Sequence, residues 1–142
     1  MKKLIVLSAM TVFISFIACA QKLDASTVPA DVKTSFGKAH PGVAAKWEKE
    51  NGKYEVNFKQ NGNTMSVLID EKGKIIETET DIKVADLPAA VLAYVKVNYK
   101  GKPINEGAMI TKAGGTVNYE AEVSGKDVIF DANGKFLKEV KN

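Results

Sequence analysis

Residues 46–76 read KWEKENGKYEVNFKQNGNTMSVLIDEKGKII, and they decide the fold because short β-prone runs alternate with turn dipeptides. The dipeptides are Asn51-Gly52, Asn61-Gly62 and Lys72-Gly73. Asn-Gly favours a two-residue type I′ turn, because both central residues of that turn need positive φ. The stretch therefore predicts a four-stranded antiparallel meander with a tight turn at each dipeptide.

Counting outward from these turns gives the register of each strand pair. The predicted pairs are Trp47 with Val56, Ala45 with Phe58, Phe58 with Met65, Val56 with Val67, Tyr54 with Ile69, and Ile69 with Ile76. Successive strand residues point to opposite faces of a sheet, so these pairs collect one apolar row on a single face. That face is the predicted core of the first half of the chain.

A helix is predicted before the meander, in TVPADVKTSFGKAHPG (residues 27–42). Thr27 is the expected N-cap, and Pro29 lies in the first turn, where its missing N–H costs nothing. One apolar face has the i, i+4, i+8 spacing of a helix. Its residues are Val28, Val32 and Phe36.

The helix pattern returns in DLPAAVLAYVKVNYKG (residues 86–101), with Asp86 as the expected cap and Pro88 in the place of Pro29. Candidate turns follow at Gly114-Gly115, Ser124-Gly125 and Asn133-Gly134. Two-residue turns there would pair Ile110 with Tyr119, Tyr119 with Phe130, and Phe130 with Leu137. The chain therefore contains an internal duplication, with repeats at residues 27–81 and 86–141.

Each repeat combines one helix with four antiparallel strands, which predicts the α+β class. A meander has one apolar face, and the amphipathic helix that precedes it is the natural cover. Edge-to-edge pairing of the two meanders would also remove two exposed edges. The expected fold is one curved, eight-stranded antiparallel sheet with both helices on one face.

The pattern V-P-A-x-V-K…W-E-K-E-x-G-K-Y-E-V…V-L-I-D-x-x-G-K, residues 28–74, resembles the PepSY-like, β-lactamase-inhibitor-protein-like periplasmic proteins of Gram-negative bacteria. The resemblance implies tandem helix-then-four-strand repeats, a single sheet with helices on one face, and residence in the periplasm. The inhibitor that gives the family its name binds its enzyme with the open sheet face, and transfer of that role to this chain would rest on fold analogy alone. That inhibitor is disulfide-bonded, whereas Cys19 is the only cysteine here.

Residues 1–20 have the layout of a secretory signal peptide. Lys2 and Lys3 precede an apolar run, and Ala18-Cys19-Ala20 supplies small residues for cleavage. Cleavage there leaves residues 21–142 as one domain, exported to the periplasm. The alternative is a lipoprotein anchored through Cys19. No other apolar run is long enough to span a bilayer.

Composition and residue types exclude several classes of function. All 20 basic residues are lysine, against 17 acidic residues, whereas nucleic-acid-binding proteins show a basic stripe with arginine. The exported domain has no cysteine for thiol catalysis or thiolate metal binding. His40 is the only histidine, and its place at a helix end favours a structural role. No nucleophile, base and orienting group can be assembled, so we expect a protein that is not an enzyme.

Two turns carry carboxylates that invite a calcium interpretation, Asp70-Glu71-Lys72-Gly73 and Asp131-Ala132-Asn133-Gly134. The carboxylates are too few for an EF-hand, and Asp and Asn are common turn formers. We therefore expect no cofactor. A calcium- or small-ligand-responsive protein is the alternative function, because calcium is associated with some members of the family that the chain resembles.

Carboxylates also face each other across strands in the predicted register. The pairs are Glu48 with Glu55 and Glu122 with Asp127. Paired carboxylates can serve acid–base chemistry when a cleft raises the pKa of one of them. On an open sheet face beside lysines we expect all four to be hydrated and ionised.

The two faces of the predicted sheet differ in kind. The core face holds the strand aromatics Trp47, Tyr54, Phe58, Tyr119 and Phe130. The helix-free face carries an apolar set, which strand parity gives as Leu68, Ile75, Met109, Ile129 and Phe136. An apolar set with a polar surround is typical of a protein-binding patch, although scattered exposed apolar residues are also ordinary. The sequence thus predicts a binding or inhibitor-like module whose partner is an unknown periplasmic protein.

Overall fold

The structure is a computed structural model, and it describes residues 21–141. The signal peptide predicted at residues 1–20 lies outside the described residues. The helices are α1 (Ala30–Ala39) and α2 (Ala89–Asn98), preceded by the 3-10 turns η1 (Ala25–Thr27) and η2 (Val84–Asp86). The strands are β1 (Gln21–Leu23), β2 (Ala45–Glu50), β3 (Lys53–Gln60), β4 (Asn63–Ile69), β5 (Ile75–Ile82), β6 (Glu106–Lys112), β7 (Val117–Glu122), β8 (Lys126–Asp131) and β9 (Phe136–Lys141). No helix within residues 21–141 has both the length and the apolar character needed to cross a membrane.

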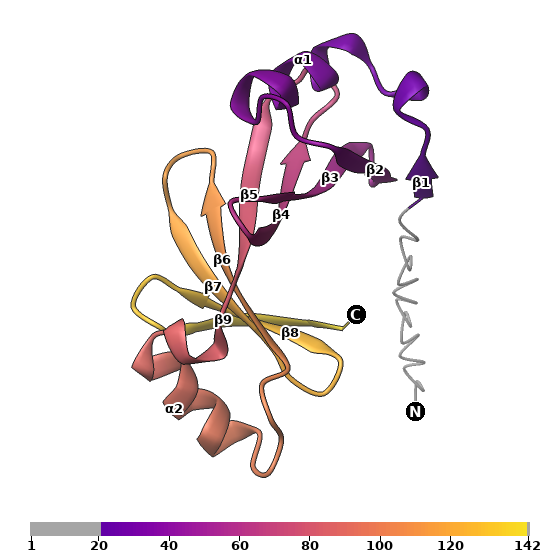
Figure 1. Cartoon of the computed structure of the whole chain (residues 1–142). Helices are drawn as coiled ribbons and strands as arrows, with labels where there is room; N and C mark the ends of the chain where they lie inside the picture. Colours follow the sequence, from indigo (N-terminus) through magenta and orange to yellow (C-terminus); the bar gives the residue numbers. More distant parts are fainter. Residues whose placement is uncertain (1–20, 142) are drawn as a thin grey trace, which may run out of the picture.

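The nine strands described form one antiparallel sheet in which neighbours in sequence are neighbours in space (Figure 1). Strands β2–β5 are the first meander, β6–β9 are the second, and β5 pairs with β6. The predicted α+β class and the duplicated helix-plus-four-strand pattern are confirmed. The sequence does not predict β1, which pairs with Trp47–Lys49. Three residues separated from their partner strand by a helix show neither a turn dipeptide nor a usable alternation.

Both helices cover the same face of the sheet, and each closes its own core. Under α1, the predicted helix face of Val28, Val32 and Phe36 is buried against the aromatic and aliphatic side chains of β2–β4. Under α2, Val91 and Val95 are buried against Phe130 and its neighbours on β7 and β8. The predicted aromatic core is confirmed, although Tyr119 is only partly buried. Burial of such a row, at about 25 cal/mol per Å², is the main stabilising term for this domain.

The predicted helix caps are wrong in both repeats. Thr27 belongs to η1, where its hydroxyl donates to the backbone oxygen of Asp24 at 2.7 Å, and α1 begins only after Pro29. Asp86 likewise ends η2, and Pro88 precedes α2. The reason is the proline, which disfavours helical geometry in the residue before it. Each candidate cap is therefore separated from its helix by one extended residue and the proline.

Three turns have the predicted two-residue geometry. Asn51, Asn61 and Ser124 take φ values of 50°, 54° and 54°, and the glycine after each is also at positive φ. These turns fix the register of β2 with β3, of β3 with β4, and of β7 with β8 as predicted. The dipeptides were sufficient there because few residue pairs favour that backbone.

Two other turns are longer than predicted and contain a β-bulge. In the β4–β5 turn, the N–H of Asp70 donates to the oxygen of Lys74 at 2.9 Å, so Ile69 pairs with Ile75 and not with Ile76. The β8–β9 turn, from Asp131 to Lys135, has the same bonds, so Phe130 pairs with Phe136 and not with Leu137. In both turns one Oδ atom of the leading Asp accepts two backbone N–H groups at 2.8–2.9 Å. This side-chain bonding stabilises the longer turn.

Both bulged turns place a glycine against a helix. A Cβ built on Gly73 would lie 2.8 Å from the backbone oxygen of Asp31 on α1, and one built on Gly134 would lie 2.6 Å from the Cβ of Ala90 on α2. Their φ values are 82° and 79°. Each turn therefore requires its glycine for two reasons, the positive φ of the backbone and the close approach of a helix.

The β6–β7 turn is also longer than predicted. The N–H of Lys112 donates to the oxygen of Thr116 at 2.9 Å, and Tyr119 therefore pairs with Met109 instead of Ile110. Only the second glycine of Gly114-Gly115 takes positive φ, at 84°. A two-glycine dipeptide permits several turn types, so it could not fix this register.

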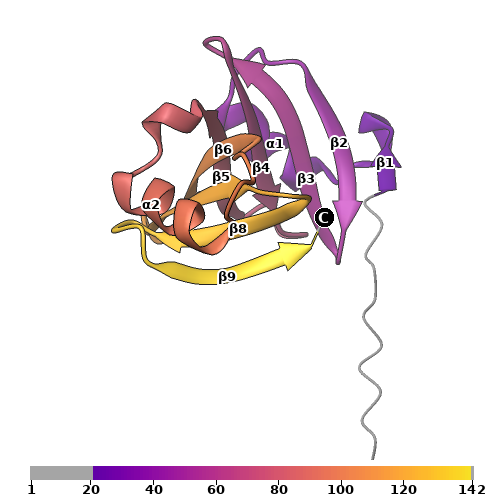
Figure 2. The ribbon, with the colours of Figure 1, turned by 90° about the horizontal axis from the view of Figure 1, so that it is seen from below.

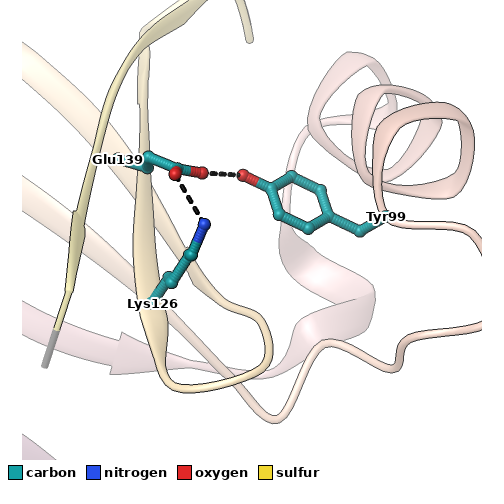
Figure 3. A network of polar contacts seen from close by, with 3 residues as sticks. All are labelled: Tyr99, Lys126 and Glu139. Atoms are coloured by element: carbon teal, nitrogen blue, oxygen red, sulfur yellow. Dashed lines mark hydrogen bonds and ion pairs between the residues drawn. The ribbon is translucent and has the colours of Figure 1, made fainter.

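A polar network connects the end of α2 to the edge strand β9 (Figure 3). Tyr99 donates its hydroxyl proton to one carboxylate oxygen of Glu139 at 2.5 Å, and Nζ of Lys126 lies 2.6 Å from the other oxygen. Lys126, and then Tyr99, hold the pKa of Glu139 below its usual value, and the bond to Glu139 raises the pKa of Tyr99 to about 12. The network ties the end of α2 to β9. It adds little stability, because these groups are exposed to solvent.

Candidate functional site

The helix-free side of the sheet, called the open face below, is concave. Glu50 at the end of β2 and Val140 on β9 line the same cavity, although the sheet order places six strands between theirs. The sheet must therefore curl toward its open face. The curved course of its strands is visible in Figure 2. The cavity measures about 550 Å³ and receives side chains from β2 and from β5 to β9.

The floor of the cavity is apolar and its rim is partly so. Ile110 and Ile129 form the floor and are only 6% and 7% exposed. Leu137 and Val140 stand on the rim at 48% and 45% exposed, and they are among the most exposed large apolar side chains of the described residues. A hollow with an apolar floor and exposed apolar rim residues is able to accept an apolar side chain from a partner.

Carboxylates surround this floor. The acidic residues that line the cavity are Glu50, Glu77, Glu79, Glu120 and Asp127, against the basic residues Lys112 and Lys138. Lys112 is already engaged, since its Nζ lies 2.8 Å from a carboxylate oxygen of Glu77. The balance of formal charge in the cavity is thus negative, although the whole chain carries +3.

Two of these carboxyl groups have strongly raised pKa values. Burial, followed by the charges of Asp81 and Glu55, raises the pKa of Glu79 to about 7. Burial, followed by the charges of Glu79 and Asp127, raises the pKa of Glu120 to about 8. The curl of the sheet is the cause, because it removes these side chains from water and crowds carboxylates of different strands together.

The open-face position predicted for Leu68 and Ile129 is confirmed. Leu68 pairs with Glu55 and Glu77 across the neighbouring strands, and it is partly buried. Ile129 pairs with Glu120, but it lies in the cavity floor and is not a freely exposed residue. Whether these residues bind a partner remains a prediction.

The open-face position predicted for Ile75, Met109 and Phe136 is wrong. Ile75 and Phe136 lie on the helix side, because a bulge at the start of each strand makes them the partners of helix-side residues. The rest of β5 and of β9 keeps the predicted register. Phe136 stacks on Tyr94 of α2 with ring centroids 5.2 Å apart. Met109 pairs with Tyr119, which is a helix-side residue, because the β6–β7 turn is longer than two residues.

The longer turns also explain why the sequence pattern assigns two of the cavity-lining residues to the wrong face. Ile110 takes the open-face place assigned to Met109, and Leu137 takes the place assigned to Phe136. The Asp-x-x-Gly pattern of the β8–β9 turn was the available sign of a bulge. No local pattern distinguishes Glu79 and Glu120 from other strand carboxylates, because their burial depends on the curl of the whole sheet.

The predicted carboxylate pairs do face each other, Glu48 with Glu55 and Glu122 with Asp127. The expectation that all four are hydrated is wrong for Glu55. Its pKa is raised, first by burial and then by the charge of Glu48.

The turn carboxylates Asp70 and Asp131 use one oxygen each to hold backbone N–H groups. Within residues 21–141, no group of three or more His, Cys, Asp and Glu side chains is arranged to hold a metal ion. His40 has a structural setting, since its Nδ1 lies 2.8 Å from Oε1 of Gln60 and its ring packs on Phe36 and Phe58.

A larger hollow of about 680 Å³ lies elsewhere, between the start of β2 and the end of β3. Its lining includes the apolar residues Val43, Ala45 and Phe58 and the basic residues Lys46 and Lys59. We regard the smaller cavity as the better site, because charged groups of several strands converge on it and two of them have displaced pKa values.

Comparison with known proteins agrees with this fold. A family model described as beta-lactamase-inhibitor-like, PepSY-like matches residues 17–77 and again residues 52–138. Among curated proteins, no sequence matches the chain.

Solved structures from Bacteroides are similar in fold. A protein of B. eggerthii described as a candidate periplasmic protein has a TM-score of 0.71 at 17% identity, over 80% of this chain and 88% of that one. A DUF2874 family protein of B. ovatus gives 0.69 at 24% identity, over 80% and 87%. A BLIP-like protein of B. fragilis gives 0.62 at 23% identity, also over 80% and 87%. With the family model matching most of its length, the chain belongs to the PepSY-like family.

Proposed function

We propose that this protein is a non-catalytic periplasmic module that binds a protein partner on its open face. The observation that carries the proposal is the concave cavity, in which a buried apolar floor and two exposed apolar rim residues are ringed by carboxylates. A site of this kind has the anatomy of a protein interface, with an apolar centre inside a polar rim. The periplasmic location is supported by the signal peptide predicted at residues 1–20 and by the descriptions of structures with the same fold.

The chemistry of the face is suited to binding, because it combines apolar surface with charged side chains. The groups that converge on the cavity are carboxylates, two lysines, one asparagine and aliphatic side chains. His40 lies on the helix side, in contact with Phe36 and Phe58, and takes no part in the cavity. A partner that is itself an enzyme would make the module inhibitor-like, in keeping with the family's description.

Site-specific photocrosslinking tests the proposal. A photoreactive side chain placed at Leu137 or Val140 samples the rim of the open face, whereas one at Val97, which is 64% exposed on α2, samples the helix side. In cells that produce the protein, we expect the same discrete protein adduct from Leu137 and Val140 and none of it from Val97. Adducts from Val97 alone, or no protein adduct from the open face, would reject the proposal.

The calcium-responsive alternative is tested on the same protein. A ligand that binds only the folded state raises the unfolding midpoint. We expect the melting temperature to be the same with calcium chloride and with a chelator. A rise with calcium that disappears in the Glu79→Gln, Glu120→Gln double variant would favour a cation site on the open face.

A further inference from the structure

We propose that the segment bound on the open face is cationic, presenting a lysine or arginine between apolar residues to the carboxylates of Glu79 and Glu120. This inference rests on the proposed function, and it names the chemistry of the partner. The occupant is a segment of another protein, extended or in a loop.

Charge complementarity is the first argument. Five carboxylates and two lysines line the cavity, and one of those lysines is paired with Glu77. The rest of the molecule is basic by comparison, because the whole chain has a formal charge of +3. An acidic segment would meet like charge at this site, so the cavity selects against it.

The position of the carboxylates is the second argument. In the sheet register Glu79 lies directly opposite Ile110, and Glu120 lies directly opposite Ile129. Each carboxylate thus stands beside one of the two apolar residues of the cavity floor. A long cationic side chain fits such a site, because its methylene groups cover apolar surface while its head reaches the carboxylate. Arginine also offers a planar fork for a bidentate carboxylate contact.

The size of the cavity is the third argument. At about 550 Å³ it is far larger than a bare metal ion requires, and it lies within the range of sites that hold a sizeable organic group. Leu137 and Val140 extend the apolar surface to the rim, where the residues flanking the cation would lie.

Binding of a cation should be linked to proton release. Burial and like charge raise the pKa values of Glu79 and Glu120 to about 7 and about 8, so a substantial fraction of both carboxyls is protonated near neutral pH, and a cation favours their ionised forms. The groups that set this balance come from every strand around them, and they are Glu50, Glu55, Glu77, Asp81, Glu122, Asp127, Lys112 and Lys138. Affinity should therefore rise with pH, by roughly tenfold or more between about pH 6 and about pH 8.5.

The test is a selection of short random peptides displayed on phage, with the purified protein as bait at about pH 8.5, where both carboxyls are mainly ionised. We expect the enriched peptides to carry lysine or arginine next to apolar residues. Their affinity should fall roughly tenfold or more for the Glu79→Gln, Glu120→Gln double variant, as for loss of charge-assisted hydrogen bonds. In that double variant, the affinity of the peptides should also no longer depend on pH.

The matched control is the Asp31→Asn, Glu71→Gln double variant, which removes the same number of charges from exposed positions outside the cavity. Unchanged binding by the control supports the inference, and equal loss in both double variants would show unspecific attraction and overturn it. Enrichment of neutral or acidic peptides would also overturn it, as would full displacement of the peptides by calcium. Circular dichroism confirms that each variant is folded before it is compared.

The outcomes separate this inference from the proposed function. Photocrosslinks on the open face combined with neutral or acidic peptides would leave the proposed function in place and remove the cationic partner. Photocrosslinks confined to Val97 would remove both.

Discussion

The carboxyl groups of Glu79 and Glu120 have folded-state pKa values of about 7 and about 8, well above the ordinary value of 4.5. Both side chains belong to strand positions that would be solvated on a flat sheet. They are instead partly buried, side by side with other carboxylates, in the hollow of a curled sheet. Burial of carboxyl groups beside other carboxylates lowers the free energy of unfolding at neutral pH. Because strongly displaced pKa values cluster at functional sites, these residues point to a use for the open face.

These pKa values make the stability of the protein depend on pH. Since the folded-state pKa values exceed the unfolded-state value, the folded protein binds more protons at pH values between them. The stabilisation is fully present below about pH 4.5 and is lost as the pH rises through about 7 and about 8. Replacing both residues by glutamine should weaken this fall. We expect melting curves at about pH 5 and about pH 8.5 to show a larger drop for the wild type than for the double variant. An equal drop in both would show that the carboxyls are not buried as described.

At the scale of the elements, the turns decide which residues reach the open face. The sequence was sufficient wherever Asn-Gly or Ser-Gly set a two-residue turn, and wherever helical spacing placed Val28, Val32 and Phe36 on one face. At the two bulged turns the prediction failed only locally, because the predicted register resumes one pair after the bulge, at Leu68 with Glu77 and at Ile129 with Lys138. Ile129 therefore lies on the open face as predicted, whereas Phe136, which follows the bulge, lies on the helix side. At the β6–β7 turn the shift of one residue runs through the whole strand pair, and it reverses the predicted face of the β6 side chains.

Contact between the bulged turns and the helices distinguishes these turns from the two-residue ones. Gly134 has a φ of 79° and would direct a Cβ to 2.6 Å from that of Ala90 on α2. Gly62 has a φ of 83°, and apart from its neighbours in the chain no atom lies within 4 Å of the place that a Cβ would take. Gly134→Ala and Gly62→Ala therefore share the cost of positive φ, and only Gly134→Ala adds overpacking. We expect Gly134→Ala to be the more destabilising by about 1–3 kcal/mol in urea unfolding. Equal losses would mean that the turn does not press on the helix.

At the scale of the whole molecule, joining two meanders through β5 and β6 produces a sheet long enough to curl. The helices occupy one side of the sheet (Figures 1 and 2). The other side becomes a hollow with its own charge and apolar floor. The sequence predicts the duplication, the single sheet and the helix-free face. It does not predict the hollow, because curvature arises from how all the strands twist together and not from any local pattern.

The central claim is that the open face, and not the helix side, receives the partner. Backbone amide chemical-shift perturbation in an NMR titration tests it most directly, with a peptide from the selection or the crosslinked partner as ligand. We predict perturbations centred on Glu79, Ile110, Glu120 and Ile129, with α1 unchanged. Perturbations centred on the exposed side of α1 or α2, with the floor of the cavity unaffected, would contradict the claim.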